Sequence, residues 1–566
     1  MAPSLTPLLN ALGWGSVDFH DRMLRPVGIV LGFLVTVLFL YALGTNSDQL
    51  LALSSGRVLR NSSSLLLCEA WFEEQDRARG HMLAGRDFDT DPVNIYEVGL
   101  PEWFVAAQKD LQECDVPCSS IRYSDAQAAS ITHWDARTDE WPQAPQDIDH
   151  SHGFAVLRNA EPPVLFPGLA VDTAHEAGYD TLMTSELASD VPLPYTGIGT
   201  TIGDLFALGL PFEKKQKAAM VVISNCGAAS FRLQAIEKMQ ELGIRVDSYG
   251  GCAHNKDFPT NDNHPRDEAG NRARYVQKIA IARTYLFYLA FENSQWPDYV
   301  TEKFYHTLQA GTVPVVIGAP NIADFAPSPE SFLYLESVED VPAVVGRMKF
   351  LMENRAAYKA MLEWKHREAS DGFKAIADIP SIHPTCRLCI HIATRLQAQE
   401  DNQTRASINQ SSVVGNKEKA PYSSKNGRLS TRLPLQLCTC RLSDVSLSSG
   451  LRLLQGLTGA DEVHRIYVRE RGRFRYRPVF LDGGDFSVRA LHAAVLRAFL
   501  VDSYEPTWVE KRKVLGIVWT TWKVYKVYPV GITIRAALGN GSFTTDSDFR
   551  EYLRQHPCPK LEAIIV

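Results

Sequence analysis

Residues 285–321 carry the pattern that most restricts the fold of this chain. Residues 286–290 form a short, wholly apolar run, typical of a strand buried on both faces of a parallel sheet. Apolar residues then recur at the four-residue spacing that gives a helix one buried stripe: Val300, Phe304 and Leu308. Gly311 can end such a helix, and a second apolar run follows at 313–317. The stretch therefore predicts a strand–helix–strand unit of an α/β sheet.

Polar residues lie at the two points of this unit where a ligand would bind. Glu292 and Asn293 follow the first strand directly, at its carboxyl end, where open α/β sheets bind ligands. Asp298 is the predicted helix N-cap. Lys303 then lies in the first helical turn, where the macrodipole disfavours a cation unless an anion is near. Lys303 is predicted either to bind a phosphate or to pair with Glu302 or Asp298.

Charge and hydropathy indicate the compartment. The formal net charge of -7 over 566 residues provides no basic field for nucleic acid, and the length allows about three domains. Residues 26–45 carry no charge over a length that crosses a bilayer as a helix, and Arg22 and Arg25 precede them. We expect a cytosolic tail (1–25), a membrane anchor, a stem (46–66) and a lumenal body. A cleaved signal peptide is the alternative for the apolar segment.

Cysteines and glycosylation motifs agree with a lumenal body. The chain has ten cysteines, most of which should be paired in an oxidising compartment, although their spacing does not give the connectivity. The pairs at 386–389 and 438–440 match zinc-site spacing poorly, which favours disulfides. Four N-x-S/T sequons are present, at Asn61, Asn402, Asn409 and Asn540.

Changes in composition divide the lumenal body. The predicted segments are an N-terminal domain (67–212), a second α/β domain (213–398), a linker (399–437) and a C-terminal module (438–566). The linker is predicted because 399–437 is rich in polar and poor in large apolar residues. Basic and aromatic residues alternate at 464–477, which indicates two strands around Gly472; the RNA-binding alternative conflicts with a lumenal address.

Three further places could carry chemistry. Arg232 follows a strand-to-helix turn that holds Asn225, where it could grip a pyrophosphate bidentately or stand solvated on its helix. Glu161 follows a predicted strand and precedes Pro162–Pro163, which hold the loop away from a helix. Its carboxylate is a candidate general base or a solvated loop residue. The acidic segment 87–91 has Asp-x-Asp spacing but is interpreted as a solvated turn.

Several of these stretches together resemble the α1,3-fucosyltransferases of glycosyltransferase family 10. The segments that carry the likeness are FENSQWPDYVTEK (291–303), LQAGTVPVVIGAPNI (308–322), SNCGAASFRLQAI (224–236), CRLCI (386–390) and YPVGIT (528–533). The likeness is greatest to the plant-type core α1,3-fucosyltransferases of N-glycans. It extends from Cys68 to the C-terminus.

The resemblance implies a GT-B architecture with two Rossmann-like domains, the acceptor on the side of 67–212 and GDP-fucose on 213–398. It implies an inverting transfer of fucose to the 3-hydroxyl of the core Asn-linked GlcNAc of N-glycans. No tightly bound cofactor or dedicated metal site is expected, with Mn²⁺ or Mg²⁺ at most stimulating the reaction. The expected setting is the Golgi membrane, as a single-pass type II protein with a lumenal catalytic part.

The likeness also assigns residues. Glu161 matches the proposed general base, and Arg232 and Lys303 match cations on the diphosphate. The other matched donor-binding residues are Glu292, Asn293, Tyr299 and Glu302. Two departures stand out. Leu286 replaces a usual lysine, which would remove a charge near the nucleotide, and Pro162–Pro163 would alter the acceptor geometry beside Glu161.

Two other functions stay open from the sequence. A Lewis-type α1,3/4-fucosyltransferase would use terminal GlcNAc as acceptor, although the plant-like C-terminal module argues against it. A non-catalytic lumenal sugar-binding protein would keep the same fold without turnover, and the two departures keep that possibility open.

Overall fold

A computed structural model describes most of the chain after residue 85. The described residues are 86–98, 111–112, 114–123, 134–139, 153–198, 202–259, 271–367, 369–413, 438–439, 463–482, 485–501, 510–514, 517–556 and 558–566. The predicted tail, membrane anchor and stem (1–25, 26–45 and 46–66) lie outside them. Among the residues described, no helix is long and apolar enough to span a bilayer.

The chain divides into two compact units. One consists of residues 63–510 and 522–566 and holds the three sheets treated below. The other includes Lys511–Thr521, which supplies nearly all of a two-stranded sheet made of β14 (Glu510–Val514) and β15 (Ile517–Thr521).

The first sheet has five parallel strands in the order β2-β1-β3-β4-β5. Its strands are β1 (Val93–Val98), β2 (Cys118–Tyr123), β3 (Ala136–Asp139), β4 (Phe154–Asn159) and β5 (Thr181–Thr184). Every residue of β4 and β5 is buried, because helices and loops cover both faces of the sheet. The short helix α7 (Val171–Glu176) connects β4 to β5. Glu161 stands at the carboxyl end of β4, in the loop that leads to α7.

The second sheet has the parallel order β10-β9-β8-β6-β7, with β8 at its centre. Its strands are β6 (Gln216–Val221), β7 (Val246–Ser248), β8 (Tyr285–Phe291), β9 (Val313–Ile317) and β10 (Leu333–Tyr334). Its helices are α8 (Ile202–Leu205), α9 (Arg232–Glu241), α10 (Asn271–Ala282), α11 (Glu302–Ala310), α12 (Val341–Glu353), α13 (Arg355–Ala360) and α14 (Asp371–Ala377). One core cluster includes residues of α10, α11 and α14, and a second includes residues of α9, α12 and α13.

The predicted strand–helix–strand unit is confirmed as β8–α11–β9, with two differences. The helix begins at Glu302 and its N-cap is Thr301, so the prediction of Asp298 as the cap is wrong. Asp298 instead has a φ of 64°, a left-handed conformation that starts no helix. Helix α11 is also buried on most of its surface rather than along one stripe, because it packs between the sheet and α8 and α10. Gly311 ends it in the predicted left-handed conformation, with φ 63°.

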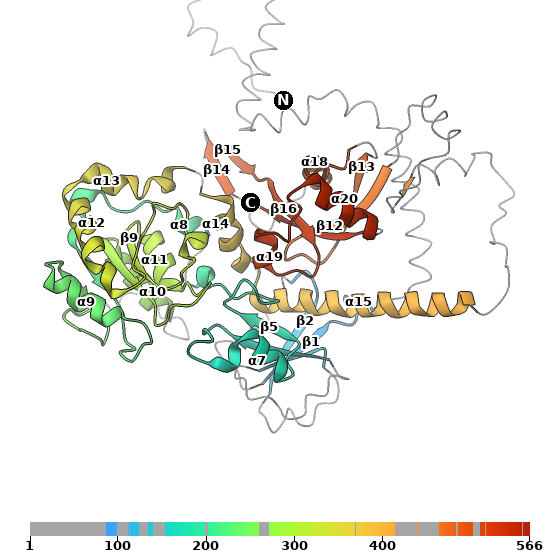
Figure 1. Ribbon diagram of the computed structural model, residues 1–566, viewed down its shortest axis with the longest axis horizontal. Coiled ribbons are helices and arrows are strands. Elements are labelled where there is room, and N and C mark those ends of the chain that lie inside the picture. Colours follow the sequence, from blue (N-terminus) through green and yellow to red (C-terminus); the bar gives the residue numbers. More distant parts are fainter. Residues whose placement is uncertain are drawn as a thin grey trace, which may run out of the picture. The chain divides into compact units, whose positions relative to one another are not determined.

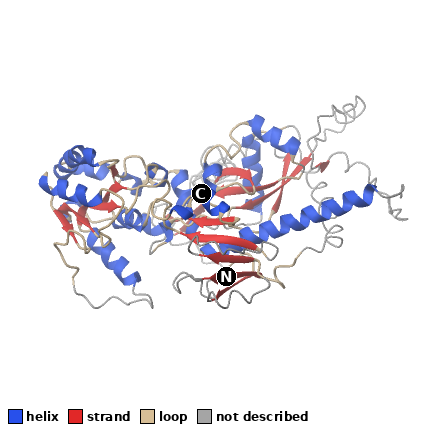
Figure 2. Ribbon diagram, turned by 60° about the horizontal axis from the view of Figure 1, so that its bottom comes forward, coloured by secondary structure: helices blue, strands red, loops and turns tan. Residues whose placement is uncertain are grey.

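Helix α15 (Pro384–Val413) corrects two predicted boundaries. The predicted linker begins at 399, yet residues 399–413 continue this helix, because polar residues such as Gln, Glu and Arg are good helix formers. The helix begins beside the first sheet (Figures 1 and 2), where its buried residues share a core with β1 and β4. Its amino-terminal part therefore packs with the first sheet and not with the second domain predicted for 213–398. The remainder of the predicted linker, 414–437, lies outside the described residues.

Disulfides reinforce that arrangement. Cys386 and Cys389 of α15 are bonded to Cys114 and Cys118, which lie just before and at the start of β2. The expectation of disulfides rather than zinc for Cys386 and Cys389 is thus confirmed. A further disulfide joins Cys226 to Cys252.

The C-terminal module contains a mixed sheet in the order β11-β12-β17-β16, with β13 paired to β12. Its elements are β11 (Cys438–Thr439), β12 (Val463–Glu470), β13 (Arg477–Asp482), α18 (Val488–Val501), β16 (Val524–Pro529), α19 (Ile534–Leu538), α20 (Asp546–Gln555) and β17 (Lys560–Ile565). Strands β12 and β13 are antiparallel around Gly472, whose φ is 82°, as the alternating pattern predicted. Asn540, one of the four sequons, is exposed just after α19.

The acidic segment at 87–91 is the exposed turn that was predicted. Asp91 forms an ion pair of 2.9 Å with Arg86, and Asp87 accepts hydrogen bonds within the turn. Within the described ranges, no group of three or more His, Cys, Asp or Glu side chains is placed to hold a metal ion.

Candidate functional site

The candidate site begins where β8 ends. Glu292 follows the strand directly and is only 2% exposed. Its carboxylate accepts hydrogen bonds from the Thr301 backbone N–H and hydroxyl, both 2.8 Å, and from Lys303 Nζ at 3.0 Å. A buried carboxylate is stable only with such partners. The N-cap of α11 is thereby tied to the end of β8, which fixes the entry to the helix.

Lys303 sits among carboxylates and not in solvent. Besides Glu292, it lies 3.7 Å from Glu302, and Glu302 lies 3.6 Å from Lys278 of α10. Burial alone would raise the pKa of Glu302, but attraction by Lys303 and Lys278 lowers it to about 2. The carboxylates hold the pKa of Lys303 above its usual value despite burial. The predicted pairing with Glu302 is present, whereas Asp298 is not a partner and Glu292 is the nearest one.

Arg232 is the first residue of α9 and is 3% exposed, which excludes the solvated alternative. Its guanidinium donates to the backbone carbonyls of Phe291 (3.4 Å) and Asn225. Burial lowers the pKa of Arg232, and the nearby Glu292 opposes this effect. Arg232 therefore brings a buried positive charge to the same strand end that carries Glu292.

The turn before α9 is covalently braced. The disulfide between Cys226 and Cys252 joins it to the segment that follows β7. The Ser230 hydroxyl also donates to the Glu292 carbonyl at 2.7 Å. These bonds hold the carboxyl ends of β6, β7 and β8 together as one edge.

Tyr299 connects this edge to the first sheet. Its hydroxyl donates to the Glu161 carboxylate at 3.1 Å, and its ring packs edge-on against Tyr195 with centroids 6.0 Å apart. The Tyr195 hydroxyl donates to the carbonyl of Ala160, at 3.2 Å. Glu161, the residue predicted on the first domain, is thus brought to the residues predicted on the second.

The loop that carries Glu161 is a turn, in agreement with its two prolines. The Glu161 N–H donates to Asn159 Oδ1 at 2.9 Å, and the Pro162 carbonyl accepts from Leu165 N–H at 3.0 Å. Both prolines are buried, while Val164 is 47% exposed. The carboxylate therefore stands on a rigid loop.

Two predicted positions do not join the cluster. The Asn293 side chain accepts from its neighbour Ser294 and contacts none of the charged groups by a hydrogen bond given for the described residues, while its backbone carbonyl accepts from the Ser230 N–H in the turn before α9. Leu286 is fully buried in a core cluster with α12 and α13, and it lies near the amino end of β8. About 20 Å of strand therefore separates Leu286 from Glu292, so a lysine at position 286 would not join the charged cluster at the carboxyl end of β8.

Two contacts at this site were not predicted. Trp296 Nε1 donates to Glu186 at 2.7 Å, and burial raises the pKa of Glu186. Asp298 is bonded to Arg535 of the C-terminal module. Trp296 and Asp298 lie within the stretch 291–303 that resembles the fucosyltransferases, and this likeness was the signal that could have singled them out. No sequence pattern indicated their partners.

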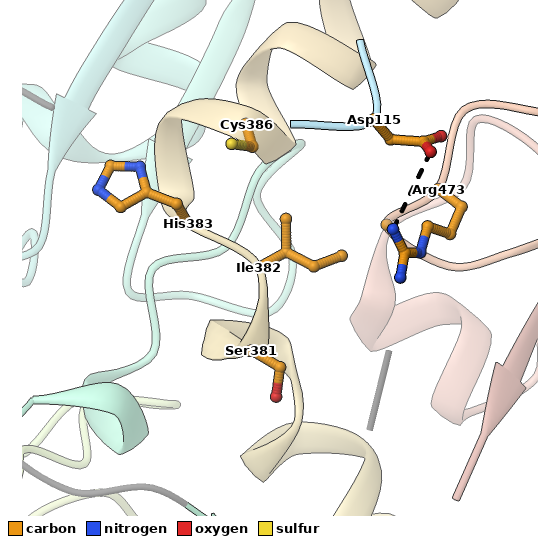
Figure 3. Close-up of a pocket in the computed structure, with 7 residues that line it drawn as sticks. Asp115, Ser381, Ile382, His383, Cys386 and Arg473 are labelled. Atoms are coloured by element: carbon orange, nitrogen blue, oxygen red, sulfur yellow. Dashed lines mark ion pairs between the residues drawn. The ribbon is translucent and has the colours of Figure 1, made fainter. Parts of the chain in front are cut away.

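A cavity of about 110 Å³ lies elsewhere in the molecule (Figure 3). It is lined by Asp115, Ser381, Ile382, His383, Cys386, Gly472 and Arg473, with Asp115 and Arg473 4.0 Å apart. None of these residues belongs to the charged cluster. The cavity is also smaller than the roughly 300 Å³ at which small-molecule sites begin.

The chain is similar in sequence to known proteins. Residues 212–410 match the model of glycosyltransferase family 10 (fucosyltransferase), C-terminal part. A fucosyltransferase-like protein of Arabidopsis thaliana is 34% identical over 502 residues, covering 88% of this chain and 80% of that protein. The chain belongs to glycosyltransferase family 10, the fucosyltransferases.

Other similar proteins match over shorter stretches. GDP-fucose protein O-fucosyltransferase 3 of Danio rerio is 39% identical over 174 residues, which are 30% of this chain and 37% of that protein. The Gallus gallus protein of that name is 37% identical over 153 residues, 27% of this chain and 31% of that protein. A crystal structure of an α1,3-fucosyltransferase aligns with 53% of this chain and 92% of its own, at 15% identity and a TM-score of 0.35.

In this member of family 10, the cluster has a definite electrostatic character. Three cations, Lys278, Lys303 and Arg232, converge on one strand edge, and two carboxylates, Glu292 and Glu302, hold two of them. Such an edge can accept a multiply charged anion, because the cations are already desolvated and oriented. Glu161 faces it from the other sheet, where a carboxylate can accept a proton.

Proposed function

We propose that the protein is an inverting α1,3-fucosyltransferase that moves L-fucose from GDP-fucose to the 3-hydroxyl of the core Asn-linked GlcNAc of N-glycans. The observation that carries the proposal is the hydrogen bond between Tyr299 and Glu161. It joins a carboxylate on one parallel sheet to a cation-bearing edge on another. Two parallel α/β sheets that meet at the carboxyl ends of their strands are what a GT-B enzyme requires.

Each side of the site has a distinct task in this proposal. Glu161 takes the proton from the acceptor hydroxyl as that oxygen attacks the fucose. Lys303 and Arg232 offset the negative charge that grows on the leaving diphosphate. Glu292 and Glu302 keep Lys303 charged and in place.

Tyr299 and Asn293 complete the set of proposed donor contacts. The Tyr299 hydroxyl donates to Glu161, and this hydrogen bond orients the carboxylate. Asn293 is placed at the same strand end, where its amide can meet the donor. These cations allow transfer without a resident metal, and Mn²⁺ or Mg²⁺ in the medium would act by screening the diphosphate.

A second acceptor class has support from the comparisons. Two relatives are named GDP-fucose protein O-fucosyltransferase 3 and match about a third of their length. Transfer to a Ser or Thr hydroxyl of a polypeptide would use the same donor edge and the same base. A Lewis-type reaction, with terminal GlcNAc as acceptor, would also use the same donor edge and the same base. It would differ from the proposed reaction only in which acceptor hydroxyl reaches Glu161.

We further propose a single-pass type II protein of the Golgi membrane, with the catalytic part in the lumen. Its support is the uncharged segment 26–45 with preceding arginines, together with disulfides such as Cys114–Cys386, Cys118–Cys389 and Cys226–Cys252. Imaging of the tagged full chain, with protease protection of the C-terminus in intact vesicles, tests this. A C-terminus accessible in intact vesicles would contradict it.

The acceptor is tested by offering the full chain GDP-fucose together with three acceptors in parallel. These are an N-glycan core on a glycopeptide, an oligosaccharide with terminal GlcNAc, and a folded protein without N-glycans. We expect fucose only on the first, α1,3-linked to the Asn-linked GlcNAc by NMR. Product only on the polypeptide would replace the proposal by protein O-fucosylation, and no product with any acceptor would leave the sugar-binding alternative.

A further inference from the structure

The loop between β8 and α11, residues 296–301, is held by side chains from distant parts of the chain. Trp296 donates to Glu186, which follows β5 of the first sheet. Asp298 contacts the same segment, since its carboxylate accepts from the Leu187 N–H at 2.8 Å. Tyr299 adds the contact to Glu161. The loop that presents the proposed donor residues therefore owes its position to partners outside its own domain.

Asp298 belongs to a closed ring of four hydrogen-bonded side chains, the others being Arg535, Asp324 and Asn321. Arg535 of α19 donates to Asp298 with one nitrogen and to Asp324 with another, at 2.7 Å for the second. Asn321 bridges the same two carboxylates, at 2.8 Å from Asp298 and 3.1 Å from Asp324. Asn321 Oδ1 also accepts from the Asp298 N–H at 2.9 Å. One arginine from the C-terminal module thus pairs with two carboxylates of the domain predicted for 213–398.

The backbone of Arg535 is fixed as well as its side chain. Its N–H donates to the Leu187 carbonyl at 2.8 Å. Thr533 caps α19 by accepting from the Ala536 N–H. Ile534 and Leu538 pack against the core cluster that contains Leu187, Val300, Ile322 and Phe325. Arg535 is therefore fixed through its backbone and its guanidinium at a junction of three segments, although its side chain is 36% exposed.

The backbone at Asp298 shows why such a contact is needed. Its φ of 64° is the left-handed conformation that non-glycine residues rarely adopt. A residue persists there only when its surroundings over-determine it. Asp298 is 6% exposed and accepts from Leu187, Asn321 and Arg535, and only Arg535 brings a compensating charge. Loss of Arg535 would leave a buried carboxylate without its counter-ion, one residue before Tyr299.

We propose that Arg535 is a positioning residue for transfer: through Asp298 it holds loop 296–301 so that Tyr299 meets Glu161 while Lys303 stays at the donor edge. The inference rests on the proposed function of that site. It gives the C-terminal module a task in the reaction, because Arg535 belongs to it. Arg535 touches neither substrate nor reacting atoms in this role.

The test compares Arg535→Ala with a matched control, Arg554→Ala, in the full chain. Arg554 belongs to the same module and pairs with Glu551 on the exposed face of α20. Sites are counted by calorimetric titration with GDP, and kcat is expressed per GDP-binding site with the acceptor on which the unaltered protein is active. We expect kcat per site to fall about 10- to 100-fold in Arg535→Ala, the scale of a misplaced catalytic group, and to stay unchanged in Arg554→Ala.

A merely structural role has a different signature. It would reduce the number of GDP-binding sites and leave kcat per site equal to that of the control, and this result would overturn the proposal. If Arg535→Ala yields no folded protein, Arg535→Lys decides. A lysine can neutralise Asp298 but has no fork to bond Asp324 as well, so an intermediate loss of kcat per site is expected. Full activity of a folded Arg535→Lys variant would contradict the need for the bridge.

A double-mutant cycle measures the coupling between Asp298 and Arg535. Asp298→Asn and Arg535→Ala should each lower kcat per site, and the double variant should be no worse than the more affected single variant. Losses that simply multiply would show that the two residues act independently. If the unaltered protein transfers no fucose to any acceptor, the proposed function fails first, and GDP titration of the variants still reports whether the donor edge needs Arg535.

Discussion

The carboxyl edges of the two parallel sheets are built in opposite ways. At the second sheet, Glu292 is 2% exposed, and the ion pairs that join Lys303, Glu302 and Lys278 are present in the protein alone. At the first sheet, Glu161 stands half-buried on a turn and meets the other side through Tyr299. The difference teaches that the proposed donor edge is preorganised by the fold, whereas the proposed acceptor edge keeps its carboxylate only half-buried, within reach of a large substrate.

The largest effect should come from the acceptor edge. Glu161→Gln keeps the size of the side chain and removes the proton acceptor, so kcat should fall about 1,000-fold, within the range attributed to general bases. The measurement is initial-rate transfer under saturating donor and acceptor. Glu176→Gln, an exposed substitution on α7 of the same domain, is the matched control. Equal rates for the two variants would remove Glu161 from the base role.

At the proposed donor edge, the expected effect of a substitution is on the free energy of unfolding. Lys303→Ala leaves Glu292 buried without its cation, so the free energy of unfolding should fall by about 3–5 kcal/mol, as for broken buried ion pairs. Lys217→Ala removes an exposed pair with Glu353 in the same domain, and it should cost no more than about 1 kcal/mol. Urea denaturation of both variants measures this. Similar losses would contradict the contrast between a buried and an exposed pair.

A smaller effect, on the pH dependence of the unfolding free energy, also distinguishes the second sheet from the first. His306 of α11 donates from Nε2 to the Ile198 carbonyl at 2.8 Å, and burial together with Lys278 lowers its pKa to about 4. The unfolded chain takes up this proton near pH 6.5, so the stabilisation is complete above that pH and is lost as the pH falls toward 4. His306→Gln should reduce the loss of unfolding free energy between pH 7 and 5 by about 2 kcal/mol.

The control for that prediction is His175→Gln, because His175 is an exposed residue on α7 of the first domain. Both variants are followed by urea denaturation at the two pH values. An unchanged pH dependence in His306→Gln would show that this histidine does not report on the donor edge.

The sequence predicted the parts of the site that depend on local pattern. The apolar runs at 286–290 and 313–317 and the glycine at 311 defined β8, β9 and the end of α11, because burial and left-handed backbone leave direct marks in the chain. Glu292 and Lys303 followed from their places at a strand end and in a first helical turn. Their mutual pairing did not follow, since it depends on the path of the loop between them.

The errors share one physical cause. Asp298 has the residue type of an N-cap, yet tertiary contacts with Leu187 and Arg535 hold it in a left-handed conformation instead. Polar residues at 399–413 look like a linker, but the helix that precedes them is nucleated by its packing on the first sheet and propagates through them. Arg535 is 237 residues from Asp298 in the chain, and no local pattern signals such a contact.

Calorimetric titration with GDP of the unaltered chain, Glu161→Gln and Lys303→Ala tests the division of labour between the two edges most directly. GDP affinity should be unchanged in Glu161→Gln, because that carboxylate serves the acceptor. It should fall in Lys303→Ala by about 1.5–3 kcal/mol, the range for a charge-assisted hydrogen bond to a phosphate. Equal affinities in all three proteins, or a loss confined to Glu161→Gln, would contradict the assignment of the second sheet to the donor.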